Sequence, residues 1–356
     1  MPETDLDYLI LGQGLAGSLL AWHLLHAGKK VLVLDDRHRS SSSWVAAGLI
    51  NPLAGMRFNR APRTEQWLES AHRFYTELGK LYGRTYFHPI DMHRLFRSPQ
   101  QKRFHQRQLD NPASQSYLGK AMSSEDFEPG IRAPHGGFEQ TRTGYLDMPQ
   151  ILADLKHWLL DRNAYREQPV DYADIKANGD EVRLGDLKAG NMVFCEGYRL
   201  LENPWFRQLP MQPDKGEFLQ LSSQRTLCRH IVNGAHMLIP LAEGGYRFGA
   251  THEHHQITPA ATPEARSQLV RGLDDLLADT QGVHITGQSA GVRPATSDRQ
   301  PFVGMHPRHP ALGVFNGFGA RGALSIPWHA KQFAAHLLHQ AAVPPEADIA
   351  RYRDRL

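Results

Sequence analysis

The sequence predicts an α/β protein with a parallel sheet near its N-terminus and an antiparallel sheet in its second half. Two observations support this prediction. An apolar run, a glycine-rich turn, an apolar helix and a second apolar run follow one another within the first 35 residues, which is the order of a β-α-β unit. Strand-like runs with glycine turns recur at 216–221, 236–240 and 246–251, as in an antiparallel sheet.

The N-terminal unit consists of a strand at Tyr8–Leu11, a helix from about Leu15 to Ala27 and a strand at Lys30–Leu34. Both strands are continuous apolar runs, which suits strands that are covered on both faces. Gly28 stands where a glycine commonly ends a helix. The acidic residues Asp35 and Asp36 follow the second strand directly.

The turn of this unit has the spacing Gly-x-Gly-x-x-Gly. Gly12 allows the tight turn, Gly14 lets the backbone approach a pyrophosphate, and Gly17 lets the helix pack closely on the strand. The helix N-terminus favours negative charge, and Asp35 is placed to bind ribose hydroxyls. The sequence therefore predicts a Rossmann-like domain that binds a dinucleotide.

The later elements are less regular. Helices are expected from Pro62, through Ile151–Leu159 and over about Pro263–Ala278, and a buried strand is expected at Met192–Cys195. The stretch Phe87–Gly137 is polar and is expected to be irregular. Near the end, a strand at Val314–Asn316 precedes a second Gly-x-Gly-x-x-Gly turn and a helix. This turn, Gly317–Gly322, is either a plain glycine turn or a set of N–H donors directed at a cofactor.

Composition excludes several classes of protein. The 356 residues fit one large or two interleaved domains, and 41% hydrophobic with 22% charged residues is ordinary for a globular chain. A formal net charge of +3 neither requires nor excludes a polyanionic partner. The only two cysteines, Cys195 and Cys228, form no CxxC pair, so a cytoplasmic, reducing location is expected. The nearly uncharged run Tyr8–Leu25 contains the three glycines, so no integral membrane span is expected.

Over essentially its whole length the chain resembles the D-amino-acid oxidase and glycine oxidase superfamily of FAD flavoproteins. The resemblance is carried by Tyr8–Gly17 with Asp35, Ser42–Leu49, Gly291–Asp298 and Gly317–Pro327. It implies a Rossmann-like FAD-binding domain formed by residues 1–85, 141–205 and 286–356. An interleaved α+β substrate domain, built on the antiparallel sheet, would comprise residues 86–140 and 206–285.

The resemblance also implies which residues bind FAD. Ser42 and Ser43 would lie near the phosphates, Ala47, Gly48 and Leu49 near the isoalloxazine, Val170 near the adenine, and the C-terminal turn near the flavin pyrimidine. The full expected set is Gly12, Gly14, Leu15, Ala16, Gly17, Asp35, Asp36, Ser42, Ser43, Ala47, Gly48, Leu49, Val170, Gly319, Ala320, Gly322, Ala323 and Leu324. No cysteine lies near the C-terminal turn, so the FAD is expected to be held non-covalently.

Arg293, Met237 and Tyr246 are expected at the substrate, and Arg293 and Arg321 are the expected catalytic residues. By resemblance, Arg293 would hold a substrate carboxylate, a role suited to its planar guanidinium, although a structural ion pair is the alternative. Arg321 would act with the C-terminal loop to stabilise reduced flavin. Glycine oxidases tend to have a tyrosine at the position of Met237, which cannot bond a carboxylate, and Tyr246 is a possible substitute.

The C-terminal motifs are more similar still to the FAD oxidase domain of the bifunctional tRNA 5-methylaminomethyl-2-thiouridine biosynthesis protein. Three segments carry this likeness: Gly291–Gly304, Gly319–Pro327 and Gly48–Leu53. RNA binding requires clustered basic residues. A partial cluster is formed by Arg57, Arg60, Arg63, Arg94, Arg97, Lys102, Arg103 and Arg107.

The expected activity is oxidation of a C–N bond in a small amine or amino-acid-like substrate. Hydride would pass to flavin N5, and water would hydrolyse the resulting imine. The alternatives are a stand-alone tRNA-modifying oxidase that acts on a carboxymethylaminomethyl-type uridine, and a non-catalytic flavin-binding subunit. No metal site is expected, because adjacent histidines in Thr251–His255 would point to opposite faces of a strand. The substrate, the electron acceptor and the oligomeric state stay open.

Overall fold

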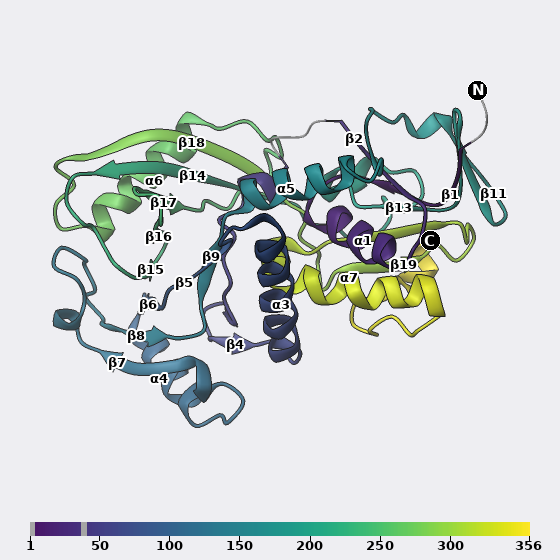
Figure 1. Ribbon diagram of the computed structural model, residues 1–356. Coiled ribbons are helices and arrows are strands. Elements are labelled where there is room, and N and C mark those ends of the chain that lie inside the picture. The colour runs from purple at the N-terminus through teal and green to yellow at the C-terminus, as the bar shows by residue number, and fades with distance from the viewer. Residues whose placement is uncertain (1–3, 37–40) are drawn as a thin grey trace.

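The computed structural model describes residues 4–36 and 41–356. Its strands form two eight-stranded sheets, one on each side of the molecule, and helices pack against both (Figure 1). The predicted α/β fold, with one largely parallel and one largely antiparallel sheet, is confirmed. Among the described residues, none of the helices combines the length and the apolar character needed to span a bilayer.

The first sheet has the parallel strands of a nucleotide-binding fold at its centre. Its path runs β10-β2-β1-β13-β12-β11, and β20 pairs with both β13 and β19. The parallel strands are β1 (Thr4–Leu11), β2 (Val31–Asp35), β10 (Tyr165–Glu167), β13 (Leu187–Phe194) and β20 (Leu312–Asn316). The antiparallel additions are β11 (Ile175–Asn178), β12 (Glu181–Leu184) and β19 (Phe302–Met305).

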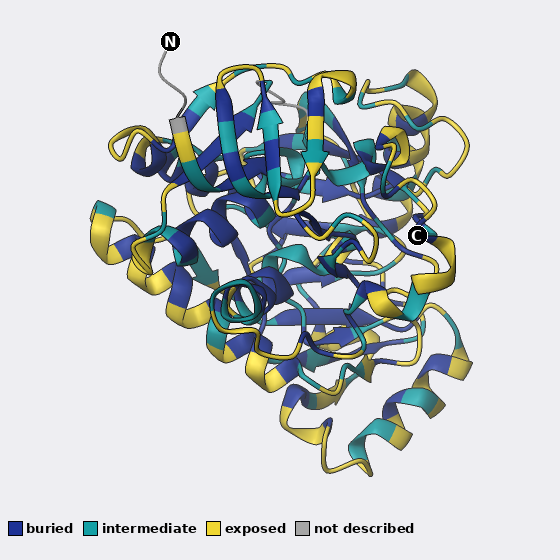
Figure 2. Ribbon diagram, turned by 90° about the vertical axis from the view of Figure 1, so that its right-hand side faces the viewer, coloured by how far each residue is buried: buried dark blue, intermediate teal, exposed yellow. Residues whose placement is uncertain are grey.

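Both faces of this sheet are covered, as the apolar runs predicted. Tyr8 and Ile10 of β1 face a core that contains the helices α1 (Leu15–His26), α3 (Thr64–Tyr82), α5 (Met148–Leu160) and α7 (Gly322–His339). Leu9 and Leu11 face the opposite core, next to Phe206. Figure 2 shows buried residues along the strands and exposed residues on the outer sides of the helices.

The second sheet has the order β18-β14-β17-β16-β15-β6-β8-β7. All its pairs are antiparallel except β15 with β6. Helix α6 (Pro263–Leu276) covers one face, where Leu269 and Leu273 pack in the same core as Leu219 and Phe248. The strands are β18 (Val283–Arg293), β14 (Asp214–Ser223), β17 (Tyr246–Gly249), β16 (Met237–Pro240), β15 (Ile231–Asn233), β6 (Met92–Leu95), β8 (Gly137–Gln140) and β7 (Leu118–Met122).

The expectation that Phe87–Gly137 is irregular was wrong. This stretch contains helix α4 (Pro99–Leu109) and the strands β6 and β7 of the second sheet. Strand β8 of the same sheet begins at its last residue, Gly137. The four residues of β6 are all buried although His93 and Arg94 are polar, so the strand does not read as an apolar run. Helix α4 is polar almost throughout, and its buried residues are Gln101 and His105.

Short elements complete the described part of the chain. They are α2 (Ser42–Val45), the pair β3 (Leu53–Ala54) with β4 (Asn59–Arg60), and the pair β5 (Phe87–Pro89) with β9 (Gly144–Leu146). The domain boundaries drawn from the sequence stay a prediction. The one between residues 285 and 286 falls inside β18, a strand that the sequence did not reveal.

Candidate active site

A cavity of about 490 Å³ is lined by residues of both sheets and of their connecting loops. The first-sheet side contributes Gly14–Ala16 and Gly319–Leu324, and the second-sheet side contributes Gly216, Met237 and Arg293. A second cavity of about 140 Å³ shares Gly14, Ser42 and Ser43 with it. Parallel strands of the first sheet end here, where ligands of such sheets bind.

The N-terminal glycine turn has the close contacts that the motif requires. Gly12 has φ +105°, and a Cβ there would lie 2.6 Å from the carbonyl oxygen of Cys195. A Cβ on Gly17 would lie 2.0 Å from the Gly12 oxygen. At Gly14 the nearest atom to such a Cβ is Ser43 Oγ at 3.3 Å, so this position is open toward the cavity. No side chain caps α1, so its first turn fits a pyrophosphate.

The smaller cavity brings together the residues expected at the adenosine end of FAD. It is lined by Gly12, Asp35, Asp36 and Val170. Asp35 Oδ1 accepts a hydrogen bond of 3.0 Å from the Gln13 N–H, which holds this carboxylate beside the glycine turn. Asp36 pairs with Arg199 at 2.6 Å. The donors and acceptors present fit a ribose and an adenine.

The two glycine turns, far apart in the sequence, line the same cavity. Gly319, Ala320, Gly322, Ala323 and Leu324 lie there with Ala47, Gly48 and Leu49. The Gly319 N–H donates to the carbonyl oxygen of Pro294 at 3.0 Å, which links this loop to the segment after Arg293. No side chain caps α7. Burial, followed by the charge of Arg299, lowers the pKa of Arg321 in the same loop.

Arg293 lies at the end of β18 and lines the larger cavity. Its Nη1 donates to Asp214 Oδ2 at 2.7 Å, and its side chain is 16% exposed. Burial alone would raise the pKa of Asp214, but the hydrogen bond from His252 and the charge of Arg293 hold it below its usual value. A Cβ at Gly216 would lie 2.1 Å from Arg293 Nη2, so this glycine makes room for the guanidinium.

Several basic residues of the cavity were not recognised as site residues from the sequence. Arg94, Arg97, His236 and His252 line it together with Arg293 and Arg321. Arg94 donates to the carbonyl oxygens of Leu53 and Gly55 and to Gln140 Oε1, all of which are neutral. Burial lowers the pKa of Arg94 to about 10. No aspartate or glutamate is among the lining residues described for this cavity, so it favours an anionic ligand.

Of the two alternatives for the position next to the substrate, Met237 lines the cavity and Tyr246 does not. The suggestion that Tyr246 substitutes at the substrate stays a prediction. Tyr246 and Phe248 of β17 face the α6 side of the sheet, and the Tyr246 hydroxyl accepts a hydrogen bond from Leu227 N at 2.9 Å. Since side chains alternate along a strand, Arg247 and Gly249 lie on the other face of β17. Gly249 lines the cavity, and Arg247 donates to the carbonyl oxygen of Ala46, a lining residue, at 2.8 Å.

The run Thr251–His255 does not gather its histidines. His252 Nδ1 lies 2.8 Å from Asp214 Oδ2, and His254 Nδ1 lies 3.4 Å from the carbonyl oxygen of Pro213. In the described part of the chain these histidines belong to no three-ligand group. His252 instead helps to hold Asp214, the partner of Arg293.

Glu196, which follows β13 and lines the smaller cavity, is expected to make stability depend on pH. Burial raises its pKa from 4.5 to about 7, against the hydrogen bonds from Tyr172 and Asn203. A raised pKa in the folded state means that Glu196 favours folding at low pH and that this contribution is lost as pH rises from about 4.5 to about 7. The free energy of unfolding should fall by up to about 3 kcal/mol over this pH range.

The measurement is the free energy of unfolding between pH 4.5 and 8 for the wild type and Glu196→Gln, at a fixed FAD concentration. The wild type should lose stability relative to the variant over this range. Parallel curves would show that the carboxyl titrates normally. Glu202→Gln is a matched control, because this nearby carboxylate is exposed.

Comparison with known proteins identifies the class. The family model described as FAD dependent oxidoreductase matches residues 7–336, and the chain belongs to this family. The prediction of an FAD-dependent enzyme is confirmed, as is the resemblance stated from the motifs.

Individual relatives are distant but extend over most of the chain. Glycine oxidase from Pseudomonas aeruginosa is 24% identical, covering 90% of this chain and 91% of that protein. A second relative is the tRNA 5-methylaminomethyl-2-thiouridine biosynthesis bifunctional protein from Marinobacter nauticus. It is 25% identical, and the match covers 94% of this chain and 56% of that protein. The solved structure of glycine oxidase from Geobacillus kaustophilus has a TM-score of 0.84 at 18% identity and covers 98% of both chains, which supports the fold.

Proposed function

We propose that this protein oxidises the C–N bond of a small amino-acid-like amine that carries a carboxylate. The observation that carries the proposal is the position of Arg293, which lines a cavity between the glycine turns and a cationic second-sheet face. A guanidinium can bind a carboxylate through two parallel N–H donors. The glycine oxidase relatives are consistent with a substrate of this class.

The residues have separate roles in this proposal. Arg293 binds the substrate carboxylate and so orients the carbon beside the nitrogen, while Asp214 holds the guanidinium in place. Arg321 and the uncapped first turn of α7 provide positive potential at the opposite side of the cavity. FAD, when bound, would supply the hydride acceptor for this oxidation. No side-chain base is assigned, because an amine that binds in its neutral form needs none.

Met237 restricts the choice of substrate. It lines the cavity at the position where glycine oxidases tend to have a tyrosine, and its thioether cannot donate to a carboxylate. Arg94 adds a second buried cation, and all three of its hydrogen-bond acceptors are neutral. Substrates with a second anionic group, or N-carboxymethyl amines, therefore fit better than a simple α-amino acid.

The test is anaerobic reduction of the flavin by a panel of amines. Glycine, sarcosine, iminodiacetate and longer N-carboxymethyl amines are added to the FAD-loaded protein, and bleaching of the flavin band is followed. An N-carboxymethyl amine should reduce the flavin faster than glycine. Reduction by none of the panel, with dithionite still effective, would favour the non-catalytic flavin-binding subunit.

A second candidate function is oxidation of a carboxymethylaminomethyl-type uridine in tRNA. It is favoured by exposed basic residues near the cavity. Gly55, Met56 and Arg97 form an exposed edge of the cavity lining, and Arg97 is basic. Gln108 of α4 donates to the Arg57 carbonyl oxygen at 3.1 Å, which joins α4 to this edge. The exposed cations there are Arg57, Arg97, Lys102, Arg103 and Arg107.

The two candidates respond differently to loss of this charge. Replacing Lys102, Arg103 and Arg107 by glutamine should lower kcat/KM for modified tRNA at least about tenfold and flatten its salt dependence. The same variant should leave the rates with small amines unchanged. If tRNA that carries the carboxymethylaminomethyl-type uridine does not reduce the flavin of the wild type, the second candidate is excluded.

A further inference from the structure

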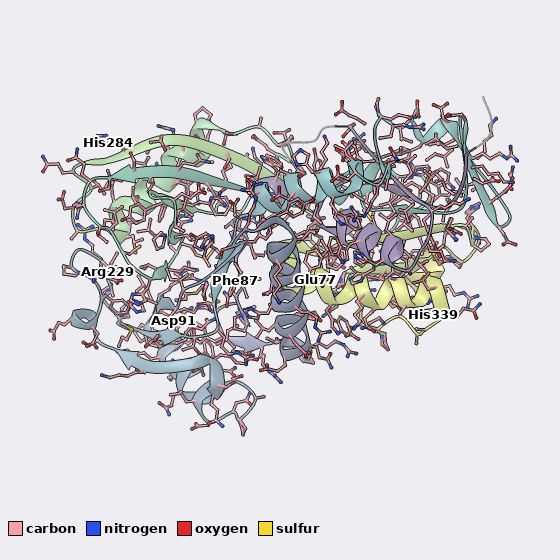
Figure 3. The ribbon with its side chains drawn as sticks, in the orientation of Figure 1. Glu77, Phe87, Asp91, Arg229, His284 and His339 are labelled. Atoms are coloured by element: carbon pink, nitrogen blue, oxygen red, sulfur yellow. The ribbon has the colours of Figure 1, made fainter. Side chains whose placement is uncertain are left out.

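A cluster of two histidines and one glutamate lies in the second sheet, outside the active-site cavity. His93 belongs to β6, His230 directly precedes β15, and Glu128 lies in the loop after the 3-10 helix Ser124–Asp126. Strands β6 and β15 are paired neighbours, with Met92 opposite Ile231. Asp91 and Arg229, labelled in Figure 3, mark this region on the left of the view, away from α1 and α7.

The three side chains bring atoms that can bind a metal close together. His230 Nδ1 lies 2.8 Å from Glu128 Oε1, and His93 Nδ1 lies 3.4 Å from Glu128 Oε2. One ligand atom from each residue lies within 4.8 Å of the others. The two imidazole rings are stacked with centroids 4.0 Å apart. Small side-chain movements would let these atoms reach one small cation with ligands at about 2.0–2.2 Å.

Protein contacts leave part of this cluster unsatisfied. His93 is only 7% exposed, and the contact of its Nδ1 with Glu128 Oε2, at 3.4 Å, is too long for a good hydrogen bond. Glu128 Oε2 is also buried without a hydrogen bond. An unsatisfied buried polar atom is costly, so a pair of them that face each other calls for a bridging partner.

A purely polar cluster explains only half of these contacts. Glu128 Oε1 accepts from the Arg229 N–H at 3.1 Å and lies 2.8 Å from His230 Nδ1. The Arg229 bond fixes the orientation of the carboxylate, as outer contacts of metal ligands do. The contact with His230 would be replaced by the ion, because one nitrogen cannot both donate to Glu128 and bind a metal. His93 Nδ1 and Glu128 Oε2 have only their long contact with each other.

We propose that His93, Glu128 and His230 bind one divalent transition metal ion, with zinc as the best match to two imidazoles and a carboxylate. The His230 side chain is 41% exposed, which leaves room for water as a fourth ligand. The ion would fasten the Glu128 loop to the β6–β15 pair. That loop also bonds to the end of α6, through Arg132 N to Leu276 O and Ala278 N to Gly130 O. The site is structural, since none of the three residues lines the active-site cavity.

The test uses the FAD-loaded protein after treatment with a chelator and gel filtration. Zinc chloride is titrated against a chromophoric competitor, bound metal is measured by elemental analysis, and thermal unfolding is followed with and without zinc. We expect about one equivalent of bound zinc and a rise in Tm of about 5 °C at a zinc concentration of about 100 times Kd. Cobalt should give the strong visible bands of a four-coordinate ion.

Variants distinguish the site from adventitious binding. His93→Gln and Glu128→Gln should lose the bound metal and the rise in Tm, and His230→Gln should do the same at a more exposed and more tolerant position. His284→Gln is the matched control, because this exposed histidine at the start of β18 is remote from the cluster (Figure 3). Equal zinc binding by His230→Gln and the wild type, or no rise in Tm of the wild type at saturating zinc, would overturn the proposal.

Discussion

Arg293→Ala is expected to lower kcat/KM about 100-fold for amines that carry a carboxylate, because it removes a charge-assisted hydrogen-bond pair in a partly buried site. Amines without a carboxylate should lose far less, since they make no bond to the guanidinium. The measurement is the rate of anaerobic flavin reduction against substrate concentration for matched amines with and without the carboxylate. Equal losses for both classes would assign Arg293 a structural role as the partner of Asp214.

Two further variants separate the charge of Arg293 from its position. Arg293→Lys keeps a cation for Asp214 but loses the planar fork, so KM should rise while the fold is retained. Gly216→Ala keeps the arginine and displaces it, since the added Cβ would lie 2.1 Å from Nη2. If Gly216→Ala has an unchanged KM, the guanidinium position described here is not the one that substrate meets.

Gly17→Val is expected to abolish FAD binding and to destabilise the fold, whereas Gly14→Ala is expected to abolish FAD binding alone. A Cβ at Gly17 would lie 2.0 Å from the Gly12 carbonyl oxygen, which is backbone and cannot move freely. At Gly14 the nearest atom is Ser43 Oγ at 3.3 Å, so the methyl group would occupy the space for the phosphates. The ratio of flavin to protein absorbance measures FAD, and circular dichroism measures folding.

Gly28→Asn provides the control for both variants. Gly28 has φ +75° with nothing within 4 Å of an added Cβ, and asparagine tolerates this conformation. This variant should keep a full complement of FAD. A Gly14→Ala protein that also retained stoichiometric FAD would contradict the placement of the phosphates at the start of α1.

The cofactor half of the fold could be predicted because its signals are local. The strand, turn and helix around Gly12–Gly17 are adjacent in the chain, and strands covered on both faces are plainly apolar. In α3, Trp67, Phe74 and Leu78 are buried at helical spacing, which is again a local pattern. At the C-terminal turn, only the family resemblance indicated that Gly319 lies beside the first turn's cavity.

The substrate half was harder to predict because its inward residues are polar. Arg94 is buried at the cavity, so the strand that carries it looks like an exposed segment in the sequence. The face that Tyr246 occupies could not be predicted, because a single residue of register decides which side chains of β17 face the α6 core. Asp214 could not be recognised as the partner of Arg293, since 79 residues separate the two along the chain.

The way the chain passes repeatedly between the two sheets has a consequence for motion. The second sheet takes its strands from residues 92–140 and 214–293, so several covalent connections join it to the first sheet. Multiple connections resist a hinge rotation of one sheet against the other. The exposed turn with Gly55 at φ +66° and Met56 at 63% exposure borders the cavity. Substrate entry is therefore expected to depend on local rearrangement of this turn rather than on rotation of one sheet against the other.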